Sequence, residues 1–77
     1  MKLHQAVAKR ILEYGEARDC SVNKICVASN VTQSTVNGLF SGRSQNPKLA
    51  TIYHLCNGLG ITLKDFFDSP LFENIEE

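Results

Sequence analysis

Two helix-start signals within residues 21–42 constrain the fold of this chain more than any other feature. Ser21 and Thr32 each precede residues with helical spacing. A hydroxyl side chain just before a helix accepts a hydrogen bond from a free backbone N–H. Between the two signals lies Asn30, a residue type that adopts the left-handed backbone conformation readily and so suits an abrupt helix end. The stretch therefore predicts two short helices joined by a tight turn.

The apolar residues of this stretch fall on one side of the two predicted helices. Ile25 and Cys26 share a face of the first helix. Val36, Leu39 and Phe40 follow the i, i+3, i+4 spacing of the second. Solvated helix faces usually carry Lys and Glu, whereas amides and hydroxyls near a helix start can contact base edges in a DNA major groove. The opposite face of the second helix carries such groups and a glycine: Gln33, Ser34, Thr35, Asn37 and Gly38.

In these features the chain resembles the helix-turn-helix of the phage Cro/repressor (Xre-type) family of DNA-binding proteins. Each motif that carries the resemblance is degenerate alone, but their order and spacing are specific. The resemblance implies an all-α, five-helix, lambda-repressor-like DNA-binding domain over residues 1–68, followed by a short C-terminal tail, residues 69–77. Between about Val7 and Phe67 the motifs are Ile25-Cys26, Asn30-Val31, Thr32-Gln33-Ser34-Thr35-Val36, Leu39-Phe40-Ser41-Gly42, Asn46-Pro47-Lys48-Leu49 and Leu59-Gly60-Ile61-Thr62-Leu63.

Helical patterns also flank the central motif. Apolar residues at steps of three or four predict an amphipathic helix over about residues 2–17. Asn46 and Pro47 are a typical helix cap and first helical residue, so they predict the start of another helix. Leu49 belongs to the predicted apolar face of that helix, and Gly60 ends it. No stretch shows sustained β alternation.

The end of the chain carries two further short patterns. Residues 62–65 resemble a capping box that starts a last short helix. The tail then restarts with a cap-like Ser69-Pro70. A segment this short does not form a stable helix alone. The tail therefore docks on its own domain, contacts a partner chain, or frays, and these alternatives stay open. Its apolar residues are Leu71, Phe72 and Ile75.

Charge is polarised along the chain although the formal net charge is zero. Residues 1–50 carry seven Lys and Arg against three Asp and Glu, while residues 51–77 carry one against five. Such a chain can present a basic face to phosphate and keep its acidic end away. No apolar run approaches the ~20 residues that span a bilayer, and the charged N-terminus is unlike a signal peptide. A cytoplasmic protein with no membrane partner is expected.

The resemblance assigns DNA contacts to two sets of residues. Glutamine can pair with adenine through two hydrogen bonds, and a hydroxyl can donate or accept, so the predicted base-reading residues are Gln33, Ser34, Thr35 and Asn37. Helix starts and the loop after the reading helix lie near the DNA backbone in this geometry. An ordinary solvated surface is the alternative interpretation for both sets. The predicted backbone-contacting residues are Ser21, Asn23, Lys24, Ser41, Arg43, Ser44 and Lys48.

Val22 departs from the family pattern. The family commonly has glutamine at this position, where it braces the base-reading residue and contacts a phosphate. A valine does neither. It contacts a thymine methyl group or packs within the domain, and both alternatives stay open.

The other reactive residues form no recognisable site. The three cysteines are an odd number without zinc-ligand spacing, which indicates reduced thiols. Cys26 and Cys56 lie on apolar faces and are expected as small core residues. His4 and His54 have no Cys or carboxylate at ligand spacing, and no serine lies in a nucleophile motif. We expect no metal, no cofactor and no enzymatic activity.

As the resemblance implies, the expected function is sequence-specific binding of double-stranded DNA by a transcriptional regulator. A repressor that binds an inverted repeat as a homodimer is expected, with half-sites about one helical turn apart. Two alternatives stay open. One is an antitoxin-like module that binds a protein partner through residues 69–77. The other is a helix bundle that no longer binds DNA, in keeping with zero net charge and Val22.

Overall fold

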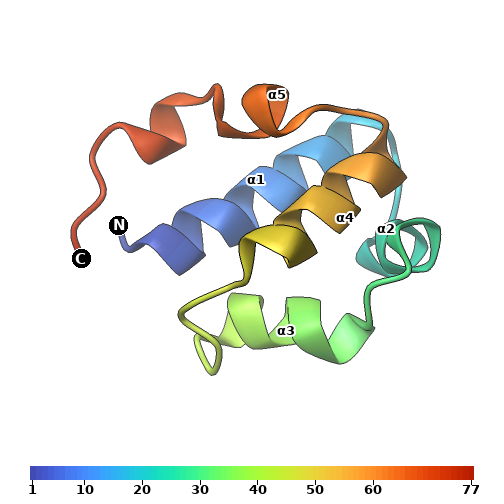
Figure 1. Cartoon of the computed structure of the whole chain (residues 1–77), viewed down its shortest axis with the longest axis horizontal. Coiled ribbons are helices and arrows are strands. Elements are labelled where there is room, and N and C mark those ends of the chain that lie inside the picture. The colour runs from blue at the N-terminus through green and yellow to red at the C-terminus, as the bar shows by residue number, and fades with distance from the viewer.

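The computed structural model describes residues 1–77 and is entirely helical (Figure 1). Five α-helices and one short 3₁₀ helix follow one another without a strand, which confirms the predicted all-α, five-helix fold. None of the helices has the length and apolar character needed to cross a membrane. The elements are α1 (Leu3–Ala17), α2 (Val22–Ser29), α3 (Gln33–Ser41), α4 (Leu49–Leu59), α5 (Leu63–Phe67) and η1 (Pro70–Phe72).

Three of the predicted helix starts are confirmed, because the local cap residues form the expected hydrogen bonds. The backbone N–H of Lys24 donates to Ser21 Oγ at 3.2 Å. The N–H of Thr35 donates to Thr32 Oγ1 at 3.3 Å. Before α5 a full capping box forms, in which the side chains of residues 62 and 65 bond to each other's backbone N–H groups. These bonds satisfy donors that the first helical turn leaves free.

The start of α4 differs from the prediction. The helix begins at Leu49 after Lys48, which forms no side-chain cap, and not at Asn46-Pro47. The N–H of Ser44 donates to the Gly38 carbonyl at 3.0 Å. This bond fixes the first part of the loop between α3 and α4 against α3. A cap residue permits a helix start, but here the chain is still crossing from α3 to α4. Leu49 consequently lies at the tip of α4 and is 62% exposed, not in the core.

The core joins all five α-helices. Figure 1 shows α1 and α4 at the centre, with α2 and α3 on one side and α5 with the tail on the other. Burial raises the pKa of the Cys26 and Cys56 thiols, which are core residues as predicted. Phe40, which shares the predicted apolar side of its helix with Val36 and Leu39, is 36% exposed. The core cluster comprises Val7, Ile11, Ile25, Cys26, Val36, Leu39, Ile52, Leu55, Cys56, Leu59 and Phe66.

The tail lies against its own domain, across the start of α1. The ring of Phe72 packs on Phe67 with 5.0 Å between centroids. Further along, the N–H of Glu76 donates to the Met1 carbonyl at 3.0 Å. A carboxylate oxygen of Glu77 accepts from the N–H of residue 3 at 2.8 Å. These contacts hold the C-terminus beside the N-terminus, at the start of α1 (Figure 1).

The connection between α1 and α2 contains a left-handed non-glycine residue, Asp19, with φ of +50°. Only glycine adopts this conformation without steric cost. We expect Asp19→Gly to raise the free energy of unfolding by about 0.5–1 kcal/mol. Urea denaturation followed by circular dichroism would measure it. Asp19→Asn removes the charge and keeps the side chain, so an equal gain in that variant would contradict the backbone explanation.

Candidate nucleic-acid interface

Helices α2 and α3 are joined by a turn that the backbone itself closes. Asn30 takes the left-handed conformation, with φ of +56°, as its residue type predicts. The N–H of Val31 donates to the Cys26 carbonyl at 3.1 Å across this turn. Beneath it, the buried Ser29 hydroxyl donates to the Ile25 carbonyl at 2.7 Å. The turn therefore fixes where the chain enters α3.

The outward side of α3 carries polar side chains that have no partner within the protein. Gln33, Ser34 and Asn37 are exposed, and none of their side chains forms an intramolecular hydrogen bond. Thr35 is also exposed, but its hydroxyl lies 2.7 Å from that of Thr32 and is occupied at the helix start. Of the four predicted base-reading residues, three therefore keep free donors and acceptors. We call Gln33, Ser34 and Asn37 the reading residues.

A shallow hollow between α2 and the start of α3 brings residues from both predicted sets together. It encloses about 360 Å³, and its polar rim includes Asn23 on α2 and Gln33 on α3. Asn30 also lines this hollow. Sequence reasoning assigned Asn30 only to the turn, because nothing local shows that its side chain shares a hollow with the other two.

The predicted backbone-contacting residues differ in how free their polar groups are. Asn23, Lys24 and Lys48 are exposed. Ser21 also caps α2, so one acceptor site of its hydroxyl is occupied. The hydroxyl of Ser41 is used in the turn after α3. Its Oγ donates to the carbonyl of residue 38 at 3.3 Å and accepts from the backbone N–H of residue 43. Ser44 is half-buried in the same turn.

Arg43 lies closer to the reading residues than its position in the loop indicates. Its Nη2 donates to the Ser34 carbonyl at 3.2 Å, nine residues back along the chain. The guanidinium group therefore rests on α3 itself. This contact was not predicted, because it depends on how the loop folds back on the helix.

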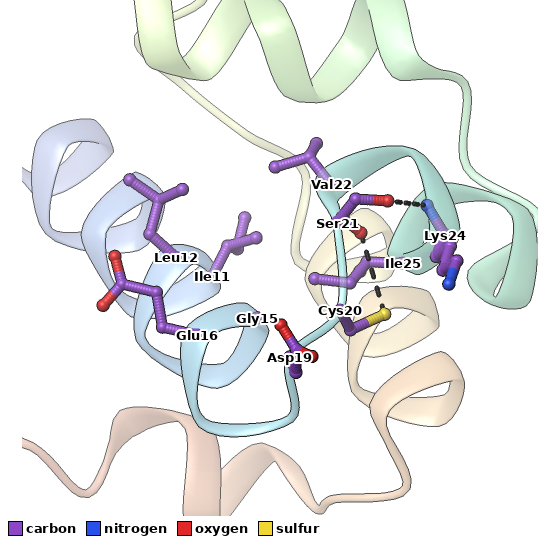
Figure 2. A pocket seen from close by; sticks show the side chains of 10 residues that line it. All are labelled: Ile11, Leu12, Gly15, Glu16, Asp19, Cys20, Ser21, Val22, Lys24 and Ile25. Carbon is purple, nitrogen blue, oxygen red and sulfur yellow. Dashed lines mark hydrogen bonds between the residues drawn. The ribbon is translucent and has the colours of Figure 1, made fainter.

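The side chain of Val22 packs within the domain. Val22 is half-buried and contacts the core cluster. Figure 2 shows the hollow of about 450 Å³ between α1 and α2 that it lines together with Leu12 and Ile25. An apolar contact therefore replaces the glutamine that the family commonly has here, and Val22 takes no part in positioning Gln33.

The two histidines lie in different environments, one buried and one exposed. His4 is 6% exposed, and Nδ1 of its ring has no hydrogen-bond partner. Its Cε1 lies below the end of α3, near Gly42. His54 is exposed on α4, where its ring is 5.9 Å from that of Tyr53. Neither histidine borders the reading residues.

The comparison with known families agrees with this geometry, in which a tight turn joins two helices and the second carries free polar groups. A model described as a Cro/C1-type HTH DNA-binding domain matches residues 10–70. The chain belongs to this Cro/C1-type family. The Cro/C1-type domain is thus a helix-turn-helix DNA-binding domain, and its family is typically non-enzymatic. The comparison with curated proteins found no match.

A solved structure is similar to nearly the whole chain, beyond the residues that the family model matches. The chain is similar to prophage Lp1 protein 11, known from a crystal structure, with 34% sequence identity and a TM-score of 0.84. The similarity covers 97% of this chain and 100% of the other. The Cro/C1-type domain therefore shares its fold with a prophage protein over nearly its whole length.

Proposed function

We propose that this Cro/C1-type domain is a transcriptional repressor that binds an inverted-repeat operator as a homodimer. In this proposal α3 enters the major groove, and the reading residues contact base edges. The observation that carries the proposal is the exposed row of unpartnered amide and hydroxyl side chains on α3. Thr35 belongs to the base-reading set once its bond to Thr32 is exchanged for one to DNA.

Phosphate contacts in the proposal come from groups beside the reading helix. Lys24, Lys48 and Asn23 are exposed, and the hydroxyls of Ser21, Ser41 and Ser44 lie at helix ends or turns. Positive charge and free N–H groups at such places attract the DNA backbone and fix the register of the helix in the groove.

The docked tail supports the DNA-binding proposal over an antitoxin-like role. Phe72 packs against Phe66 and Phe67, and the end of the tail is bonded to the first residues of α1. A protein partner that bound through residues 69–77 would have to break these contacts first. The similarity to a prophage protein also favours a phage-derived regulator.

Selection of bound duplexes from a random pool at about 100 mM salt tests the proposal. We expect enrichment of an inverted repeat with half-sites about 10 base pairs apart, since a two-fold homodimer places two α3 helices in successive major grooves. Sedimentation of the complex should give two chains per duplex. If no sequence is enriched, the proposed function is wrong, and a pull-down with the intact chain would then test for a protein partner.

Gln33→Ala is the sharpest single test of base reading. We expect it to cost about 1–3 kcal/mol of binding free energy on the selected site, because a bidentate pair with a base is lost. Binding to an unrelated duplex should hardly change. Fluorescence anisotropy with both duplexes would measure the two affinities.

Lys24→Ala serves as the matched control for Gln33→Ala. Removing a phosphate contact should weaken both duplexes to a similar extent and reduce the salt slope by about 1. If Gln33→Ala behaved in the same way as Lys24→Ala, Gln33 would be a backbone contact and not a base-reading residue.

A further inference from the structure

The loop after α3 returns along the helix and does not leave it. Gly42 ends α3 in the left-handed conformation, with φ of +81°. The N–H of Ser44 then donates to the carbonyl of Gly38 at 3.0 Å, which fixes the loop against the last turn of the helix. This reversal directs the side chain of Arg43 back toward the start of α3, where Nη2 reaches the Ser34 carbonyl at 3.2 Å.

Gly38 provides the space in which the Arg43 side chain lies. A Cβ atom at residue 38 would lie 3.2 Å from Arg43 Nη2 and 3.4 Å from the Cβ of Ser44. Gly38 is itself buried although it lies on the outward side of α3, because these two residues cover it. A side chain at residue 38 would push the guanidinium group away from the helix.

The guanidinium group lies on the side of α3 that faces away from the core. Val36 and Leu39 are buried and mark the inward side of the helix. At about 100° per residue, Ser34 points about 170° away from the midpoint of those two residues, and Gly38 about 130° away. Arg43 therefore lies on the outward side of α3 next to Ser34, at one edge of the strip that also carries Asn37 and Gln33.

Most of the donors of Arg43 are free. An arginine side chain has five N–H donors, and this one makes a single hydrogen bond within the protein. No carboxylate neutralises it, since the two ion pairs of the molecule are Met1–Glu76 and Arg10–Glu13. An unpaired guanidinium group held in one place on a reading helix has the geometry for two parallel hydrogen bonds to one planar acceptor.

We propose that Arg43 reads a guanine base through O6 and N7, and does not act as the phosphate contact that its place in the loop predicts. Bidentate pairing of arginine with guanine is the commonest specific contact in the major groove. Gly38 acts as the positioning residue, because it lets the guanidinium group lie on α3. The proposal rests on the proposed function, since it requires α3 in the groove.

The test compares duplex selection and salt dependence for wild type, Arg43→Ala, Arg43→Lys and Gly38→Ala. We expect the site selected by the wild-type protein to contain one guanine that Arg43→Ala no longer requires. Arg43→Ala should bind the guanine-containing site about 5- to 150-fold more weakly than wild type does. Arg43→Lys should also lose much of this preference, because an ammonium group cannot pair in a bidentate manner. Replacing that base pair in the DNA should abolish the difference between wild type and Arg43→Ala.

Gly38→Ala separates base reading from charge. It keeps the cation, and alanine favours helix at this interior position, so the variant should fold. We expect it to lose the guanine preference while its salt slope stays unchanged.

Two outcomes would overturn the proposal in different ways. If Arg43→Ala kept the selected sequence, weakened every duplex equally and lowered the salt slope by about 1, Arg43 would be a phosphate contact. If wild type enriched no sequence at all, the proposed function itself would be wrong.

Discussion

Gly58→Ala should destabilise the domain by about 3 kcal/mol, because α4 passes α2 too closely at this residue for a side chain. A Cβ atom there would lie 2.8 Å from both the backbone nitrogen and the Cα of Ser29. Backbone atoms of a packed helix cannot move aside as the end of a flexible side chain can. A domain of this size has a total stability of only about 4–12 kcal/mol. Thermal denaturation should show a midpoint about 12–24 °C lower.

Two control variants separate close packing from backbone conformation at Gly58. Gly60 has φ of +71° and open space around it, so Gly60→Ala should cost about 1–2 kcal/mol from conformation alone. The double variant Ser29→Ala with Gly58→Ala removes the hydroxyl but leaves the Ser29 backbone in place. It should remain as unstable as Gly58→Ala. Recovery in the double variant would show that only the Ser29 hydroxyl excludes a side chain.

The Gly58 contact also bears on DNA binding. Ser29 is the last residue of α2, and the turn at Asn30 leads from it directly into α3. A displacement of α4 from α2 at this point moves the entry to α3. Gly58→Ala should therefore weaken binding even at temperatures where most of the protein stays folded.

Local signals in the sequence predicted much of the fold because they depend on neighbouring residues only. The hydroxyl caps at Ser21, Thr32 and Thr62 bond to N–H groups three residues away, and Asn30 turns the chain through its own backbone. The polar side of α3 was visible from spacing alone. These features require no knowledge of how the helices pack.

Other features depend on residues far apart in the chain and could not be predicted from local patterns. The close approach of Gly58 to Ser29 joins residues 29 positions apart, and the Arg43–Ser34 bond requires the loop to return along α3. The predicted start of α4 was wrong for the same reason. Asn46-Pro47 is a suitable cap, but the chain is still crossing from α3 at these residues, and α4 begins at Leu49.

Arg10 shows the same limit, since its role depends on partners more than 50 residues away. Its Nε donates to the Phe66 carbonyl at 2.7 Å, and its Nη2 donates to the Asp65 carbonyl at 2.6 Å. A weaker bond reaches the Asp68 carbonyl at 3.3 Å. The last carbonyls of a helix have no partner inside it, and α5 has only five residues. Arg10 thus supplies from α1 the donors that α5 lacks.

Arg10→Met should lower the free energy of unfolding by about 3 kcal/mol, because these carbonyls lose charge-assisted hydrogen bonds at a site where the arginine side chain is only 16% exposed. Methionine keeps an apolar stem of similar length, so lost packing contributes little. Urea denaturation would measure the change, and amide hydrogen exchange at Phe66 should quicken as α5 frays.

Arg18→Met is the matched control, since both guanidinium groups lie over the ring of Tyr14, at 4.6 Å for Arg10 and 4.9 Å for Arg18. Arg18 is exposed and its side chain makes no hydrogen bond, so the loss of its ring contact should cost at most about 1 kcal/mol. Equal effects of the two variants would mean that the ring contact, and not the carbonyls, accounts for the stabilisation. A larger effect of Arg10→Met would show that α5 is held through α1, so that Phe66 stays in the core.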